Sequence, residues 1–228
     1  MADGTTPAPV AVLIVDDHRM FAQSLARLLE DDDRITVVGV AATSAEGILA
    51  AAELGPAVVL VDFQLPDLDG VATARAIRAQ HPETMVVMLT GSTDDRVLLG
   101  AIDAGCSGYI TKDRVVDDVA GAIVAAAAGE ALISPAQLAR LLPRLSTAGR
   151  AASPDLTDRE RQLLACMAEG LSNKAIAARL NLSINTVRNY VQNTLGKLDA
   201  HSKLEAVAAA IRQGIISYPS GPEPPPAP

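Results

Sequence analysis

The stretch VVLVDFQLPDLDG, residues 58–70, runs from four aliphatic residues into Asp62 and then through a polar loop to Gly70. A short apolar run that stops at an acidic residue and is followed by helical spacing is typical of a buried parallel strand and its crossover helix. Similar apolar runs occupy residues 10–15, 35–40, 85–89 and 108–111, with helical spacing over residues 21–29, 45–53, 70–80, 94–104 and 113–128. We therefore predict five βα repeats that form a doubly wound α/β domain.

Five polar residues stand where four of these apolar runs stop. They are Asp16, Asp17, Asp62, Thr90 and Lys112. Taken singly, such an aspartate more often caps a helix, and a lysine or threonine there is more often an ordinary surface or turn residue. The carboxyl ends of parallel strands meet at one edge of the sheet, however, and ligands bind there. The five together therefore predict one shared polar pocket.

Composition and charge indicate two domains of different character. The chain has 228 residues and a net charge of -8, with 49% hydrophobic but only 2% aromatic residues. Residues 1–154 hold 11 Lys and Arg against 20 Asp and Glu, whereas residues 155–218 hold 8 against 6. An acidic domain joined to a mildly basic one is compatible with a partner that is a polyanion.

The sequence also predicts where the protein acts and what its cysteines do. Its first residues lack a basic region and an apolar core, and the longest nearly apolar stretch, residues 119–129, is too short to span a bilayer. We expect a soluble cytoplasmic protein with no membrane contact. Cys106 and Cys166 have no CxxC spacing and are expected to be free, buried thiols.

Changes in residue composition and in hydrophobic periodicity along the chain predict its domain boundaries. We expect a flexible N-terminus at residues 1–9, the α/β domain at 10–131, a linker at 132–154, an all-helical domain at 155–216 and a disordered tail at 217–228. A short helix is possible within the linker at residues 137–142. Four helix starts are predicted in the second domain, with Thr157 and Ser202 opening capping boxes and Ser172 and Ser183 as simple N-caps.

Two of these four helices have the proportions of a helix-turn-helix. They are the segments at residues 175–180 and after Ser183, separated by a short break. The second segment carries an apolar stripe that should face the core, formed by Val187, Val191, Leu195 and Leu198. Its other side carries groups that can contact base edges and phosphates, namely Arg188, Asn189, Gln192, Asn193 and Lys197. An ordinary solvated face is the alternative, but the absence of acidic residues between Asn181 and Leu198 favours DNA.

Specific motifs resemble a known family. The sequences LTDRE at 156–160, GLSNKAIA at 170–177, TVRNY at 186–190 and KL at 197–198 resemble the LuxR-type DNA-binding domain. The sequences VDD at 15–17, VDFQLPDLDG at 61–70, LTG at 89–91 and GYITK at 108–112 resemble a response-regulator receiver domain. Together they resemble the NarL/FixJ family of two-component regulators, which implies a flavodoxin-like receiver followed by a four-helix DNA-binding domain.

This resemblance implies a role for each residue of the predicted pocket. Asp62 would accept a phosphoryl group from a sensor histidine kinase. Mg²⁺ would be held by Asp16, Asp17, Asp62 and the backbone carbonyl of Gln64, because a hard cation with oxygen ligands relieves the repulsion among the carboxylates. Lys112 and Thr90 would contact the phosphate, and Tyr109 would act as a switch with Thr90.

The resemblance also implies a DNA-binding homodimer that regulates transcription rather than an enzyme. The residues expected to contact double-stranded promoter DNA are Lys174, Thr186, Arg188, Asn189, Gln192, Asn193 and Lys197. Residues 202–213 would form the dimer helix, with Val207, Ala208 and Ile211 on one side. The chain departs from the family at Asp113, where many receivers have proline, at Tyr190, where many relatives have histidine, and at Gly196.

Two other functions remain open on the sequence alone. A DNA-binding protein with a vestigial receiver could be controlled by a ligand, or could act without phosphorylation. A phosphohydrolase could use Asp62 as its nucleophile with Mg²⁺. The chain offers no substrate-sized cap domain for such an enzyme, and the helix-turn-helix would then be unexplained.

Overall fold

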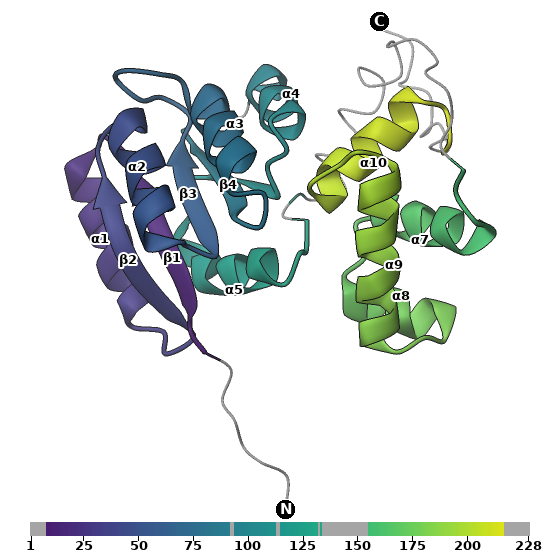
Figure 1. Cartoon of the computed structure of the whole chain (residues 1–228). Helices are drawn as coiled ribbons and strands as arrows, with labels where there is room; N and C mark the ends of the chain where they lie inside the picture. Colours follow the sequence, from purple (N-terminus) through teal and green to yellow (C-terminus); the bar gives the residue numbers. More distant parts are fainter. Residues whose placement is uncertain (1–7, 92–93, 113–114, 132, 134–154, 217–228) are drawn as a thin grey trace, which may run out of the picture. The chain divides into compact units, whose positions relative to one another are not determined.

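The computed structural model describes residues 8–91, 94–112, 115–131, 133 and 155–216. Five strands alternate with five helices in the first part of the chain (Figure 1). The strands are β1 (Val10–Val15), β2 (Ile35–Ala41), β3 (Val58–Asp62), β4 (Met85–Thr90) and β5 (Gly108–Thr111). The helices are α1 (Arg19–Glu30), α2 (Ser44–Leu54), α3 (Gly70–Gln80), α4 (Asp95–Asp103) and α5 (Val115–Ala127). The prediction of five βα repeats is confirmed.

The strands form one parallel sheet in the order β2-β1-β3-β4-β5. Alternate residues of a strand face opposite sides of a sheet. Val12, Ile14 and Leu60 therefore lie in one core with residues of α1 and α5. On the other face, a Cβ at Gly47 of α2 would lie 2.7 Å from Val15 Cγ2, so this helix packs closely against β1. The sheet is covered on both faces, which explains why its strands are continuous apolar runs.

Two details of the α/β part are not evident from the sequence pattern. The N-cap of α2 is Thr43, whose side chain accepts a hydrogen bond from the Glu46 N–H, and not Ser44. Ser44 instead begins the helix and is buried, with its Oγ 2.7 Å from Thr73 Oγ1. Leu28, which fits the apolar spacing of α1, is 44% exposed.

The second part of the chain is helical, as predicted, and comprises α7 (Asp158–Ala168), α8 (Asn173–Leu180), α9 (Ile184–Lys197) and α10 (Lys203–Arg212). The capping box at the start of α7 is confirmed, and so are the N-caps Ser172 and Ser183. At α10 the Glu205 N–H donates to Ser202 Oγ, but the Glu205 carboxylate accepts the N–H of His201 instead of closing the box on Ser202.

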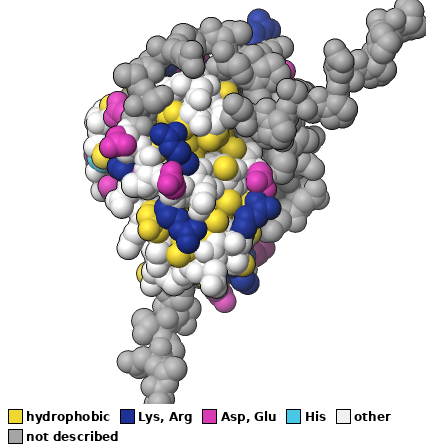
Figure 2. Space-filling view, turned by 90° about the vertical axis from the view of Figure 1, so that its right-hand side faces the viewer, with side chains coloured by type: hydrophobic (Ala, Val, Ile, Leu, Met, Phe, Trp, Pro, Cys, Tyr) yellow, Lys and Arg dark blue, Asp and Glu magenta, His cyan; other side chains and the backbone are white. Residues whose placement is uncertain are grey.

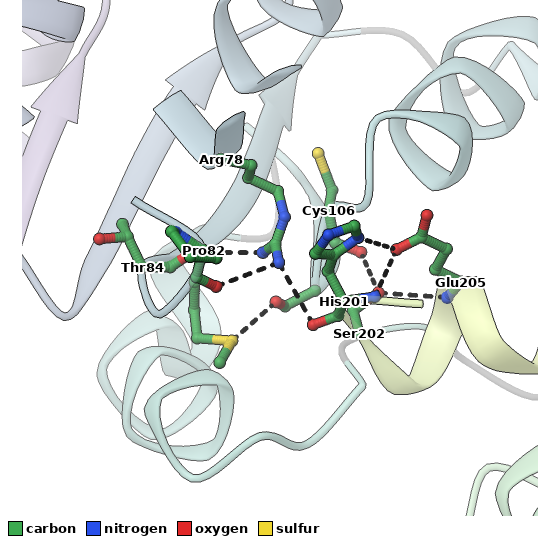
Figure 3. A network of polar contacts seen from close by, with 9 residues as sticks. Arg78, Pro82, Thr84, Cys106, His201, Ser202 and Glu205 are labelled. Atoms are coloured by element: carbon green, nitrogen blue, oxygen red, sulfur yellow. Dashed lines mark hydrogen bonds and ion pairs between the residues drawn. The ribbon is translucent and has the colours of Figure 1, made fainter. Parts of the chain in front are cut away.

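Contacts divide the chain into two compact units. Residues 1–134 and 200–205 make up the first unit, and residues 135–199 and 206–228 make up the second. The predicted boundaries had placed residues 200–205 in the second domain. Within the first unit, Ser202 Oγ donates to the Cys106 carbonyl at 3.0 Å, and Arg78 Nη2 donates to the His201 carbonyl at 3.3 Å (Figure 3).

Several further predictions can be compared with the described residues. Cys106 and Cys166 are free and buried, as predicted. Val207, Ala208 and Ile211 are at most 8% exposed in the single chain, and the role of residues 202–213 as a dimer helix stays a prediction. The predicted short helix at 137–142 and the tail at 217–228 lie outside the described residues. In the described part of the chain, no helix combines the length and apolarity needed to cross a bilayer.

Candidate functional site

The carboxyl ends of four neighbouring strands bring the predicted pocket residues together. Asp16 follows β1, Asp62 ends β3 and Thr90 ends β4. Lys112 follows β5, and its backbone N–H donates to the Thr90 carbonyl at 2.8 Å. Because β1, β3, β4 and β5 are adjacent in the sheet, these residues share one edge, as the sequence predicted.

Lys112 contacts two of the three carboxylates at this edge. Its Nζ lies 2.7 Å from Asp16 Oδ2 and 2.8 Å from Asp62 Oδ2. The same ammonium lies 4.8 Å from the ring centroid of Phe21, a cation–π contact from α1. Asp16 and Asp62 are 1% and 3% exposed, so a single cation compensates two buried negative charges.

Burial dominates the electrostatics of Asp62. Loss of water raises the pKa of the Asp62 carboxyl, and the negative charge of Asp16 raises it further. The hydrogen bond from Lys112, its positive charge and the backbone N–H of Gln64 oppose these effects without cancelling them. Burial alone would lower the pKa of Lys112, but its hydrogen bonds to Asp16 and Asp62 produce a net rise. The pocket thus favours the charged form of Lys112 and disfavours the charged form of Asp62.

The sequence predictions missed His18 as a member of this cluster. Its Nδ1 lies 2.9 Å from Asp17 Oδ1, 3.3 Å from Asp16 Oδ1 and 3.7 Å from Asp62 Oδ2, and its side chain is 65% exposed. The only signal in the sequence is its place directly after the aspartate pair. One ligand atom from each of these four residues lies within 4.8 Å of the others.

The donor set fits a hard divalent cation. Asp16, Asp17 and Asp62 supply carboxylate oxygens, which are the ligands that Mg²⁺ prefers in proteins. Burial, and then the charge of Asp16, raise the pKa of Asp62, so a second cation at this edge would stabilise its ionised carboxylate. Gln64 follows two residues after Asp62, with its N–H directed to the Asp62 carboxylate.

The loop from β3 to α3 is held at several points. The Asp67 carboxylate accepts hydrogen bonds from the backbone N–H groups of Ser44 and Ala45, at 2.8 and 2.9 Å. Asp69 caps α3 by accepting the Ala72 N–H at 2.7 Å. These bonds fix the segment that carries the Gln64 carbonyl.

Gly70 closes this loop against β3. Its N–H donates to the Phe63 carbonyl at 2.9 Å, and a Cβ at this position would lie 2.8 Å from Phe63 Cα and still closer to the Asp62 carbonyl oxygen. Only glycine allows such an approach without a backbone shift.

Thr90 and Tyr109 lie on neighbouring strands next to the carboxylates. Thr90 is 2% exposed at the end of β4, and Tyr109 is 5% exposed on β5 in register with Met88. Both side chains are therefore buried, and the role of Tyr109 as a switch stays a prediction.

In the second unit, α8 and α9 form the predicted helix-turn-helix. The turn between them is made by residues 181–183, and Asn181 adopts a left-handed φ of 53° that ends α8. Ser183 Oγ then accepts the Thr186 N–H at 3.0 Å and starts α9. The buried stripe of α9 is confirmed, since Val187, Val191 and Leu195 are at most 8% exposed.

The predicted DNA-contacting residues divide into free and engaged groups. Lys174, Arg188, Asn189, Gln192 and Asn193 are exposed. Thr186 Oγ1 lies 2.8 Å from Ser183 Oγ, so its hydroxyl serves the helix start. Lys197 Nζ donates to Glu160 Oε2 at 2.8 Å and to the Asp155 carbonyl at 3.1 Å, so it ties α9 to α7.

Two exposed residues of α9 were not predicted. Ile184 is 40% exposed and Asn185 is also exposed. Asn185 precedes Arg188 and Asn189 by three and four positions, a spacing that could have identified it. On the face that Figure 2 presents, Lys and Arg side chains are interspersed with acidic and apolar ones.

Comparisons with known proteins agree with both halves of this description. Residues 12–123 match the model of the response regulator receiver domain, and residues 154–210 match that of the bacterial regulatory proteins of the luxR family. The chain is 34% identical over 210 residues to the transcriptional regulatory protein LiaR of Bacillus subtilis (strain 168), covering 91% of this chain and 100% of LiaR. It is 34% identical over 207 residues to the response regulator protein VraR of Staphylococcus aureus (strain NCTC 8325 / PS 47), covering 91% and 99%.

Solved structures show the same likeness. The response regulator ChrA of a heme-sensing two-component system is 31% identical, with a TM-score of 0.50 and coverage of 92% of this chain and 100% of ChrA. The RcsB response regulator of Salmonella typhimurium, in a structure on conformational dynamism for DNA interaction, is 25% identical, with a TM-score of 0.53 and coverage of 88% and 97%.

Proposed function

Because the chain belongs to the two-component response regulators that join a receiver domain to a luxR-type DNA-binding domain, we propose that Asp62 is its phosphoacceptor and that α9 reads its DNA. The family consists of transcriptional regulators and not of enzymes, so turnover of a phosphate ester is not its function. The observation that supports the assignment of Asp62 is that its carboxylate contacts Lys112 and lies in one cluster with Asp16 and Asp17.

Phosphoryl transfer at this site requires little covalent chemistry from the protein. An Asp62 carboxylate oxygen attacks the phosphorus, the P–O bond forms, and the P–N bond to the histidine of the partner kinase breaks. Asp16, Asp17, Asp62 and the Gln64 carbonyl would hold Mg²⁺, which when bound neutralises charge on the transferred group. Lys112 already contacts Asp62 Oδ2 and would pair with a phosphate oxygen.

Thr90 and Tyr109 would report the phosphate to the rest of the receiver. Both are buried on neighbouring strands, Thr90 at the end of β4 and Tyr109 within β5. The Thr90 hydroxyl would move toward the phosphate and leave space that the Tyr109 ring occupies. A phosphate that binds one of two arrangements more tightly shifts the population toward it. The expected output is a change in dimerisation and in binding to promoter DNA, in the cytoplasm where kinase and DNA are both accessible.

For DNA recognition, the exposed side of α9 is the relevant surface. Arg188 can bind guanine in a bidentate manner, and Asn189 or Gln192 can do the same with adenine. Lys174, which is exposed at the start of α8, would contact phosphate. We retain Lys197 and Thr186 only as weaker candidates, since both already have partners within the chain.

Intact-mass analysis after incubation with acetyl phosphate and Mg²⁺ tests the proposal directly. The wild-type chain should gain one phosphoryl group, Asp62→Asn should gain none, and Asp33→Asn, at an exposed aspartate away from the site, should behave as wild type. The same three proteins are then titrated against the DNA upstream of the protein's own gene. A wild-type mass that does not change would instead support a vestigial receiver.

A further inference from the structure

Gly196 lies in the last turn of α9, and no described residue packs against it in a way that requires glycine. It is exposed, and it is not among the glycines with positive φ, which are Gly55, Gly105, Gly129, Gly170 and Gly214. Among the described residues, no atom lies within 4 Å of the place where a Cβ would stand. Glycine in a helix interior costs about 1 kcal/mol relative to alanine. Neither backbone conformation nor packing within the described chain offsets this cost.

The position of Gly196 on α9 is informative. With 3.6 residues per turn, it lies on the same line of the helix as Asn185, Asn189 and Gln192. This line is the centre of the exposed side, opposite the buried Val187 and Val191. The glycine therefore interrupts the surface that the proposed function assigns to DNA.

The dimensions of duplex DNA indicate which part of the duplex would lie against Gly196. From Asn185 to Gln192 the helix advances about 10 Å, and a major groove is about 12 Å wide. Gly196 lies about 6 Å beyond Gln192 along the axis, so it reaches the sugar–phosphate ridge that borders the groove. The N–H groups in this turn are already bonded within the helix, so the glycine supplies clearance and not a hydrogen bond.

We propose that Gly196 is the point at which α9 crosses the sugar–phosphate backbone of duplex DNA, and that its missing side chain lets Asn185, Asn189 and Gln192 reach the base edges. This inference rests on the proposed function of α9. A side chain at residue 196 would hold the C-terminal end of α9 away from the ridge and lift the base-contacting residues with it. The position is thus part of the DNA interface although it contributes no polar group.

The test compares stability with DNA binding in the full-length chain. Gly196→Ala and Gly196→Gln remove the glycine without changing charge, and Ala165→Gln adds the same side chain at an exposed position of α7 as a control. Thermal unfolding midpoints should rise by a few degrees for both Gly196 variants, because the helix gains propensity. Binding is measured by fluorescence anisotropy with a fluorescein-labelled duplex of mixed sequence at low salt, since backbone clearance does not depend on base sequence.

For the Gly196 variants we expect the thermal unfolding midpoint to rise and the affinity for DNA to fall. Affinity should fall roughly fivefold for Gly196→Ala and at least about tenfold for Gly196→Gln, the range that overpacking costs, while Ala165→Gln binds as wild type. Two stabilised Gly196 variants that bind as tightly as wild type would overturn this inference alone, provided that Arg188→Ala weakens binding. A wild-type chain that, after treatment with acetyl phosphate and Mg²⁺, binds neither this duplex nor the DNA upstream of the protein's own gene would overturn both this inference and the proposed function.

Discussion

The ammonium of Lys112 lies 2.8 Å from Oδ2 of Asp62, the carboxylate that we propose is phosphorylated. The same ammonium lies 2.7 Å from Asp16, so one cation holds two buried acids that would otherwise repel each other. Lys112 therefore supplies positive charge at the edge where we propose that Mg²⁺ and a phosphoryl group bind.

Lys112→Met should destabilise the receiver in the absence of divalent ions. Removing one partner of a largely buried ion pair leaves the remaining charges unpaired, and we expect the free energy of unfolding in EDTA to fall by about 2 kcal/mol. Mg²⁺ should bind the variant more tightly than wild type, because a competing positive charge is gone. Urea unfolding and titration calorimetry measure the two effects, with Arg19→Met at an exposed cation as the control. Equal Mg²⁺ affinities would contradict this prediction.

Asp62→Asn should stabilise the metal-free protein at neutral pH. Burial raises the pKa of Asp62, so above that raised pKa the folded protein carries a charge that the unfolded chain accommodates more easily. This destabilisation of the folded wild-type protein disappears as the pH falls through the raised pKa and the Asp62 carboxyl is protonated. The thermal midpoint of the variant should thus exceed that of wild type most at pH 7 and approach it on acidification. A variant less stable than wild type at pH 7 in EDTA would show that the Lys112 contact outweighs burial.

Much of this edge could be predicted because it depends on backbone topology. Parallel strands are buried on both faces and read as apolar runs, and their carboxyl ends must converge. The proximity of Asp62, Thr90 and Lys112 could therefore be predicted from the strand topology without knowledge of side-chain conformations. His18 was missed because its ring reaches the cluster through a side-chain conformation that its spacing does not specify.

The remaining differences arise from contacts between distant positions. Lys197 fits the polar face of α9 by periodicity, yet its ammonium bonds to Glu160, which precedes it by 37 positions. Val207 and Ile211 form an apolar stripe that could face either a core or a partner, and only the packing showed that they are buried. Helical spacing identifies which residues share a face, but not what that face contacts.

Gly70→Ala should damage the phosphoacceptor site through the backbone of Asp62. The added methyl group would meet the Asp62 carbonyl and Phe63 Cα, both of which are backbone atoms that cannot rotate away. We expect a loss of about 2 kcal/mol in unfolding free energy, in the range of overpacked sites, together with slower phosphorylation by acetyl phosphate. Gly91→Ala has open space in the same structure and should retain wild-type stability. Unchanged urea midpoints for Gly70→Ala would count against the close approach.

Glu160→Gln should weaken the helical unit in a pH-dependent way. Burial alone would raise the pKa of Glu160, but hydrogen bonds from Lys197 and Thr157 lower it overall. Such a group stabilises the folded state above its unfolded pKa, and the contribution is lost as the pH falls through the lowered value.

The variant should therefore lose about 1 kcal/mol at pH 7, and its urea midpoint should converge with that of wild type in acid. Glu169→Gln, which removes an exposed pair with Arg179, provides the matched control and should have little effect. A difference in urea midpoint between Glu160→Gln and wild type that stays constant with pH would show that ionisation of Glu160 does not stabilise the fold.

The bonds that Asp67 and Asp69 make within the loop after β3 bear on how fast this edge can respond. A loop already tied to α2 and α3 does not search through conformations when an ion arrives. Because Mg²⁺ gives up its water reluctantly, the slow step of its binding would be dehydration of the ion and not closure of the protein. The rate of activation would then be limited by the dehydration of Mg²⁺ and by the encounter with the kinase, and not by a rearrangement of this loop.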